Sequence, residues 1–177
     1  MIDYLKVYAQ QLAPHLAPQE RPVGSWRASY HSGREDLGQP PSAVDGWTVA
    51  DVVLGLPSPA LMDASEQLVS GTSLVGWPGC FALQIRDAAR SGTRIVLTDL
   101  RLLIVRINSQ GFVVTWDCPR AAVFRVQRAS RTGQRGRVWL TCRDGSSVAL
   151  VLSYFLARPA NRLIAAWGEI PGMISEP

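Results

Sequence analysis

The sequence predicts an α+β fold in which a bent antiparallel sheet or barrel of seven strands is capped by a C-terminal helix, with additional helices. Three observations predict it. Short apolar runs recur between residues 93 and 153 with turn residues between them, as in an antiparallel meander. An apolar stripe at helical spacing follows them and needs a surface that buries it. The length of 177 residues fits a single domain with one core.

Composition and charge exclude several classes of protein. With 47% hydrophobic and 18% charged residues, the chain is too apolar and too weakly charged for intrinsic disorder. The formal net charge of +4 is too small by itself to indicate a nucleic-acid-binding protein. No run reaches the roughly 18 apolar residues of a transmembrane segment, and no signal peptide is recognisable. We therefore expect a soluble, cytoplasmic protein.

Before the meander, the chain predicts a helix, a strand and a long irregular stretch. Apolar residues at three- and four-residue spacing indicate an amphipathic helix over residues 2–13, which ends before Pro14. Residues 23–30 suit a short strand. The Gly-, Pro- and Ser-rich residues 32–46 suggest a surface loop, and we expect a short helix near residues 60–69.

A further helix is expected over residues 78–91. Pro78 suits the first helical position, where a missing N–H costs nothing, and Gly92 suits a stop. Five apolar residues share one face of this helix: Phe81, Ala82, Ile85, Ala88 and Ala89. Arg86 and Arg90 lie on the opposite face.

The six strands expected in the meander are short and rich in Val, Ile, Leu, Phe and Trp. They cover residues 94–98, 102–107, 112–116, 122–129, 137–143 and 146–153. Asp144-Gly145 predicts a hairpin with a type I′ turn, because that turn needs positive φ at both central positions. In this hairpin we expect Val138, Leu140 and Cys142 inward and Arg137, Thr141 and Arg143 outward, with Trp139 breaking the pattern.

The C-terminal helix is expected over residues 156–168. Its apolar stripe consists of Leu156, Ala160, Leu163, Ile164 and Trp167. Pro159 suits the first turn of this helix and Gly168 its end. Because such a stripe must be buried, we expect the helix to cap an open end of the barrel.

Three short segments within this order of elements resemble a known superfold. Residues 95–104 (Ile-Val-Leu-Thr-Asp-Leu-Arg-Leu-Leu-Ile) are similar to the LTDRRLL hairpin of bacterial pleckstrin-homology-like (PH-like) and GRAM-like domains. Residues 16–20 (Leu-Ala-Pro-Gln-Glu) resemble the L-x-P-G-E lead-in of those domains, with Gln19 in place of glycine. Residues 144–146 (Asp-Gly-Ser) match the turn before their last strand.

The resemblance extends over residues 93–168 and, more weakly, over residues 15–30. It implies a single PH-like domain over residues 1–177, with an N-terminal helix (1–14), an insertion (32–92), and the core meander with its capping helix. In eukaryotic PH domains, the loop at the position of this insertion binds phosphoinositides. Its basic motif cannot be matched residue by residue here, so the resemblance implies no lipid site in this sequence.

The densest charged feature lies between residues 120 and 143, where seven of the 17 arginines occur without an acidic residue. The expected hairpin places five of them near one another: Arg125, Arg128, Arg131, Arg135 and Arg137. Clustered guanidinium groups suit a phosphate or carboxylate partner, because each donates two parallel hydrogen bonds. The alternative is a solvated hairpin whose arginines protect exposed strand edges.

Other candidate residues have structural explanations beside functional ones. Trp47 and Trp77 flank the middle of the insertion and would either anchor a partner or cover the sheet. Cys80, Cys118 and Cys142 have no CxxC spacing, and with only two histidines in the chain they indicate buried thiols rather than a metal site. No catalytic constellation, phosphate-binding loop or cofactor motif is recognisable, so we expect no cofactor and no enzymatic activity.

The sequence therefore favours a non-enzymatic binding module that recognises or assembles with another protein. The alternative is peripheral binding to an anionic phospholipid membrane through the arginine-rich hairpin, which would place the protein at the membrane surface. Nucleic-acid binding through the same arginines ranks third, because only Phe124 and Trp139 interleave with them as stacking surfaces.

Overall fold

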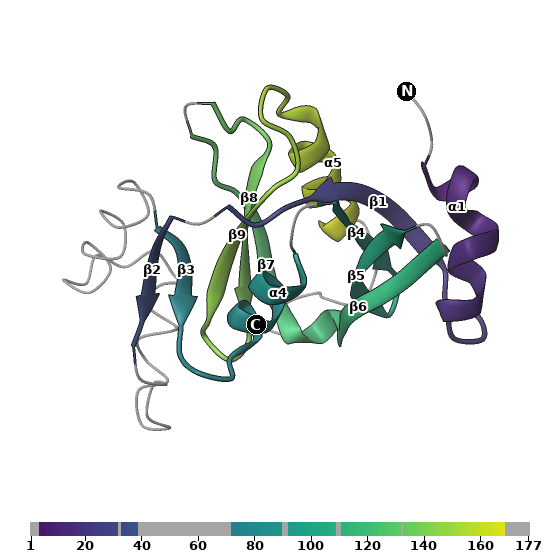
Figure 1. Ribbon diagram of the computed structural model, residues 1–177, viewed down its shortest axis with the longest axis horizontal. Coiled ribbons are helices and arrows are strands. Elements are labelled where there is room, and N and C mark those ends of the chain that lie inside the picture. Colours follow the sequence, from purple (N-terminus) through teal and green to yellow (C-terminus); the bar gives the residue numbers. More distant parts are fainter. Residues whose placement is uncertain are drawn as a thin grey trace.

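The computed structural model describes residues 4–31, 33–38, 72–89, 92–108, 111–131 and 133–168. These residues form an α+β structure with two sheets (Figure 1). The elements before the meander are α1 (Tyr4–Leu12), the 3-10 turn η1 (Ala13–His15), β1 (Pro22–Ala28), β2 (Arg34–Leu37), β3 (Thr72–Gly76) and α4 (Phe81–Ala88). They are followed by β4 (Thr93–Thr98), β5 (Arg101–Asn108), β6 (Gly111–Pro119), the 3-10 turn η2 (Arg120–Ala122), β7 (Val123–Arg128), β8 (Arg137–Cys142), β9 (Ser147–Val151) and α5 (Arg158–Gly168). In the described part of the chain, no helix has the length and apolar character needed to cross a membrane.

The short strand β1 and the six strands expected after residue 92 are all present, but they do not form a single bent sheet or a closed barrel. One sheet has the strand order β1-β4-β5-β6 and the other has the order β2-β3-β9-β8-β7. The meander is interrupted between β6 and β7, where η2 buries Arg120 and leads the chain into the second sheet. Its strands pair antiparallel on either side of this break.

α1 confirms the N-terminal helix and covers the outer face of the first sheet. Leu12 is buried there against Val96, Leu103 and Phe112. The α-helix ends before Pro14, as expected, and the chain continues through the 3-10 turn η1. This small second core fixes the start of the chain to β4, β5 and β6.

The insertion adds two strands to the second sheet. Residues 34–37, expected in a surface loop, form β2 and pair parallel with β3. β2 lacks apolar alternation, and side-chain contacts hold Glu35 in it: Glu35 accepts hydrogen bonds from the Tyr30 hydroxyl (2.6 Å) and from Arg86 Nη1 (2.8 Å). β3 extends the sheet by antiparallel pairing with β9. The helix expected near residues 60–69 lies outside the described residues.

α4 confirms the helix of the insertion, but it begins at Phe81 rather than at Pro78. The turn between β8 and β9 caps it, because the Phe81 N–H donates to Asp144 Oδ2 (2.8 Å). In that turn Gly145 has positive φ and Asp144 does not. The antiparallel pairing of β8 with β9 confirms the hairpin, whereas the type I′ turn is wrong.

The main hydrophobic core lies between the two sheets and beneath α5. It joins Ile95 of the first sheet to Leu150 of the second and to Leu163 and Trp167 of the helix. α5 contacts β1 and β7, one strand from each sheet, and so closes one end of the core (Figure 1). The helix begins after Leu156, which is 61% exposed, so placing Leu156 on the buried stripe is wrong.

Candidate functional site

The arginine-rich segment forms the hairpin between β7 and β8, whose tip projects from the second sheet (Figure 1). Two backbone hydrogen bonds between Arg131 and Gln134 close the tip. Gly133 lies between them with a φ of 76°, a left-handed conformation that favours glycine. At the base of the tip, the Ala129 N–H donates to Arg137 O (3.0 Å). Backbone hydrogen bonds therefore hold the described residues of the hairpin end.

Three arginines lie at the end of this hairpin and are called the arginine tip: Arg128, Arg131 and Arg135. Arg128 and Arg135 are exposed, and Arg131 is half-buried. Arg128 Nε donates to Ser130 Oγ (2.8 Å), and that hydroxyl donates to Arg135 O (3.2 Å). Within the described residues, no carboxylate forms an ion pair with Arg128 or Arg135. Both side chains are exposed, and no carboxylate of the described residues compensates their charges.

Arg125 is exposed on β7 but is separate from the arginine tip. It pairs in register with Thr141, three residues from Arg128 along the strand, a separation of roughly 10 Å by strand geometry. Phe124, next to it, is also exposed. The hairpin thus carries positive charge along its length, most densely at the tip.

Arg137 does not belong to the exposed patch, and its expected place there is wrong. Its residue exposure is 3%, and its Nη2 donates to Thr72 O of β3 (2.6 Å). Burial, and after it the charge of Arg131, lowers the pKa of Arg137. Trp139, expected on the same outer face of β8, is buried as well. Alternation along β8 cannot reveal that both faces of the strand are covered at these positions.

Sequence reasoning missed an exposed apolar segment in the connection from β9 to α5, here called the Phe155 loop. Its exposed residues are Tyr154 (43%), Phe155 (81%) and Leu156 (61%). Backbone hydrogen bonds join this loop to the hairpin: the Arg135 N–H donates to Tyr154 O (2.9 Å) and the Gly136 N–H to Ser153 O (3.0 Å). The loop and the arginine tip therefore lie side by side at one end of the molecule (Figure 1).

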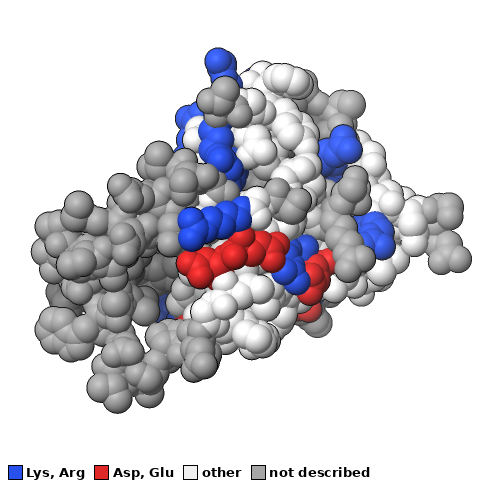
Figure 2. Space-filling view, turned by 60° about the vertical axis from the view of Figure 1, so that its left-hand side comes forward, with Lys and Arg blue, Asp and Glu red and all other residues white. Residues whose placement is uncertain are grey.

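The segments that build this end of the molecule contain basic residues and no acidic ones. No Asp or Glu occurs between residues 118 and 143 or between residues 145 and 168. In the space-filling view, the basic side chains at the top have no acidic neighbour, and the acidic side chains of that face form a band lower down (Figure 2). The hairpin and the Phe155 loop therefore contribute basic and apolar side chains, and no acidic ones, to this end of the molecule.

The other candidate residues take structural positions. Trp77 is half-buried and packs against the main core, whereas Trp47 lies outside the described residues. Cys80, Cys118 and Cys142 are all buried. Burial raises the pKa of Cys118 to about 12 and also raises that of Cys142, so both are protonated thiols at neutral pH.

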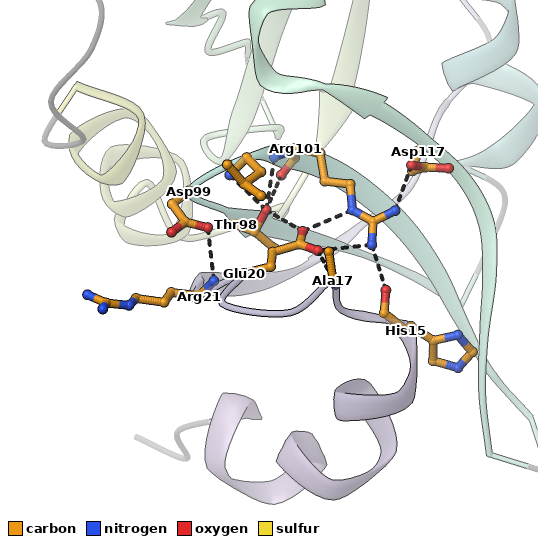
Figure 3. A network of polar contacts seen from close by, with 9 residues as sticks. His15, Ala17, Glu20, Arg21, Thr98, Asp99, Arg101 and Asp117 are labelled. Atoms are coloured by element: carbon orange, nitrogen blue, oxygen red, sulfur yellow. Dashed lines mark hydrogen bonds and ion pairs between the residues drawn. The ribbon is translucent and has the colours of Figure 1, made fainter.

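A second polar cluster lies where the lead-in segment meets the hairpin of β4 and β5 (Figure 3). The Glu20 side chain is fully buried there. It accepts hydrogen bonds from the Ala17 N–H (2.8 Å), the Thr98 hydroxyl (2.7 Å) and Arg101 Nε (2.9 Å). This Glu20 cluster joins residues 16–20 to residues 95–104, two segments that are far apart in the sequence.

All three guanidinium nitrogens of Arg101 have acceptors in the Glu20 cluster. Nη1 donates to Asp117 Oδ2 (2.9 Å), while Nη2 donates to His15 O (2.6 Å) and to the second oxygen of Glu20 (3.0 Å). Burial acts to raise the pKa of Glu20, but its hydrogen bonds, chiefly with Arg101, outweigh burial and lower that pKa. The charges in this cluster are therefore compensated by one another.

The lead-in segment, residues 16–20, contains a backbone conformation that favours glycine. Gln19 has a φ of 71° and is the only non-glycine residue with positive φ in the described part of the chain. Just after it, the Arg21 N–H donates to Asp99 Oδ1 (2.9 Å), and the Asp99 N–H donates to Arg21 O (3.1 Å). These bonds hold the backbone turn against β4.

No protein-family model matches this sequence, and no curated protein matches it.

Proposed function

We propose that the chain is a non-enzymatic, PH-like binding module. The order of its elements supports this interpretation: β1, then six antiparallel strands, then the amphipathic helix α5. The Glu20 cluster adds support, because it brings together two segments whose sequences resemble that superfold. β2 and β3 extend the second sheet, and with α4 they belong to the insertion that distinguishes this chain from a minimal PH-like domain.

The module binds an anionic surface through the arginine tip. The observation that carries this proposal is that Arg128 and Arg135 are exposed without an ion-pair partner among the described residues, in a segment without acidic residues. Guanidinium groups donate paired hydrogen bonds to phosphate or carboxylate oxygens, and a patch of one sign steers an oppositely charged partner. Phosphate and carboxylate surfaces share this chemistry.

Charge reversal at the tip tests the proposal. We would measure binding of the wild type and of Arg128→Glu/Arg135→Glu to phosphatidylglycerol vesicles, polyglutamate and mixed-sequence RNA. The wild type is expected to bind at least one of these probes and to lose affinity between about 0.1 M and 1 M salt, as the Debye length shortens from about 10 Å to 3 Å. Each basic residue near an anionic surface contributes about 1 kcal/mol, so the variant should lose at least roughly thirtyfold in affinity.

The matched control is Arg106→Glu/Arg143→Glu, which changes the net charge equally. Both of these arginines are exposed, and Arg143 lies at the other end of β8 from the tip. The control should retain wild-type binding. Equal losses in the two variants, or no salt-sensitive binding to any probe, would refute the arginine tip as a binding site.

A further inference from the structure

We propose that the anionic surface is a phospholipid bilayer, and that Phe155 and Leu156 insert into it while the arginine tip contacts lipid phosphates. The inference rests on the proposed function and adds the partner and the apolar part of the site. It begins from the exposure of the Phe155 loop. Other large apolar side chains exposed in the described residues include Val7 of α1, Leu100 in the turn between β4 and β5, and Val113 of β6, each of them single. Only the Phe155 loop, among the described residues, exposes three consecutive large side chains.

The structure presents the loop and the arginine tip as one unit. Besides the two hydrogen bonds that join them, the backbones are in close contact at Gly136. A Cβ atom added to Gly136 would lie 2.6 Å from Leu156 O and 2.8 Å from Ser153 O. Glycine is therefore required for this approach. Because the two backbones are packed together, Phe155 and the tip arginines meet a partner at the same time.

Tyr154 anchors the base of the exposed segment. Its hydroxyl lies 2.5 Å from His31 Nε2, and its ring packs edge-on against the imidazole with centroids 5.2 Å apart. Phe155, one residue farther, is the most exposed large apolar side chain of the described residues. The Phe155 loop is thus held in place at Tyr154 and exposes the apolar Phe155 side chain.

An exposed apolar segment next to the exposed guanidinium groups of Arg128 and Arg135 matches the interface of an anionic bilayer. Aromatic and aliphatic side chains bury their area at the boundary between headgroups and acyl chains, while arginine keeps its charge at the level of the phosphates. An acidic protein or a single nucleic-acid strand meets the same charge. A nucleic-acid strand, however, would need aromatic faces repeated along its path. The arrangement of charge and apolar surface therefore favours lipid.

The test compares vesicle binding by Phe155→Ser/Leu156→Ser with that by the matched control Leu100→Ser/Val113→Ser, which also removes two exposed apolar side chains. Burial of one large apolar side chain contributes roughly tenfold or more to an affinity. The loop variant should therefore bind phosphatidylglycerol vesicles at least about tenfold more weakly than the wild type. The control should bind as the wild type does, and both variants should keep the wild-type urea midpoint.

A fluorescent label distinguishes insertion from adsorption by charge. Phe155→Cys labelled with an environment-sensitive dye should shift to the blue with phosphatidylglycerol vesicles and not with phosphatidylcholine vesicles. The three native cysteines are buried and do not compete for the label. Leu100→Cys is the control position. The Leu100 carbonyl accepts a hydrogen bond from Arg120 N, and the Arg120 guanidinium stacks on Trp167 near the C-terminal end of α5. Leu100 therefore lies toward the opposite end of α5 from the Phe155 loop. The dye there should not shift.

The outcomes separate this inference from the proposed function. If charge reversal at the tip abolishes vesicle binding but loss of Phe155 and Leu156 does not, and the dye does not shift, insertion is refuted and binding to an anionic surface stands. Salt-sensitive binding to polyglutamate or RNA with none to vesicles likewise refutes the bilayer and keeps the arginine tip. If the tip variant binds every probe as the wild type does, the proposed function itself fails.

Discussion

The Glu20 cluster and the arginine tip use the same side chain in opposite ways. In the cluster, all three guanidinium nitrogens of Arg101 have an acceptor, supplied by Glu20, Asp117 and a backbone carbonyl. At the tip, Arg128 contacts the hydroxyl of Ser130, and the ion pairs of the described residues do not involve it. The first arrangement joins parts of the chain that are far apart in sequence. The second joins little beyond its own turn.

The charges of the Glu20 cluster therefore support folding, whereas those of the arginine tip are available to a partner. A buried carboxylate must be paired, so removing one member of the Glu20 cluster leaves an uncompensated polar group. An exposed arginine is solvated in the free protein and contributes little to its stability. Mutation should therefore separate the two regions by what each loses: the cluster loses folding stability, and the tip loses binding.

The largest expected effect is that of Glu20→Ala. We expect the free energy of unfolding to fall by about 3–5 kcal/mol, because the variant breaks a buried pair and removes one acceptor from the Thr98 hydroxyl and the acceptor of Arg101 Nε. Urea denaturation measures this loss. The control is Asp117→Asn, whose carboxylate is 44% exposed and which should lose no more than about 1 kcal/mol. If Glu20→Ala and Asp117→Asn both lower the free energy of unfolding by the same small amount, the Glu20 cluster does not support folding more than an exposed charge does.

A matched pair of leucines separates the buried and exposed parts of the C-terminal segment. Leu163→Ala should cost at least about 2 kcal/mol, because Leu163 is fully buried in the main core. Leu156→Ala should change the free energy of unfolding by no more than about 0.5 kcal/mol. Thermal or urea denaturation of the two variants checks this. A large loss in Leu156→Ala would mean that this residue packs within the fold and is not available to a membrane.

Acid should weaken the Glu20 cluster in a defined direction. The folded-state pKa of Glu20 lies below its ordinary value of 4.5, so its contribution is complete above that pH and is lost as the pH falls through the lowered pKa. Glu20→Gln lacks this titration. The difference in unfolding free energy between wild type and Glu20→Gln should therefore narrow on acidification below about pH 4.5. A constant or widening difference would contradict the pairing.

Gln19→Gly tests the backbone of the lead-in segment. The left-handed conformation costs a non-glycine residue about 1–2 kcal/mol, which the greater flexibility of unfolded glycine offsets by about 0.5–1 kcal/mol. We expect a net gain of about 0.5–1 kcal/mol in stability. Gln10→Gly, at an exposed position within α1, should instead lose about 1 kcal/mol. Equal signs in the two variants would show that φ at Gln19 carries no strain.

The strands after residue 92 were predictable because local signals define them. Apolar runs and turn residues mark each strand, and the stripe of α5 is visible at Ala160, Leu163 and Trp167. The division into two sheets was not predictable, because it depends on η2 burying Arg120 against a helix that follows far along the chain. β2 was also missed, because side-chain contacts of its Glu35 with Tyr30 and Arg86 hold it, and no apolar pattern marks it.

The candidate site was predictable only in part. The density of arginines identified the hairpin, but strand periodicity could not show that Arg137 is buried by reaching Thr72. Leu156 was missed because the sequence places it on the apolar stripe of the expected helix, and Phe155 because it lies between that helix and the last expected strand. Their exposure follows from the position of Arg158, where α5 begins. Placing the start of the helix after Leu156 would have revealed that Phe155 and Leu156 are exposed.

The central claim is that the arginine tip serves binding and contributes little to folding. The most direct measurement is the free energy of unfolding of Arg128→Glu/Arg135→Glu by urea denaturation, beside wild type and Arg101→Glu. We predict a change of no more than about 0.5 kcal/mol for the tip variant and a loss of at least about 3 kcal/mol for Arg101→Glu. A loss of about 2 kcal/mol or more in the tip variant would contradict the claim and make the arginine tip part of the folding machinery.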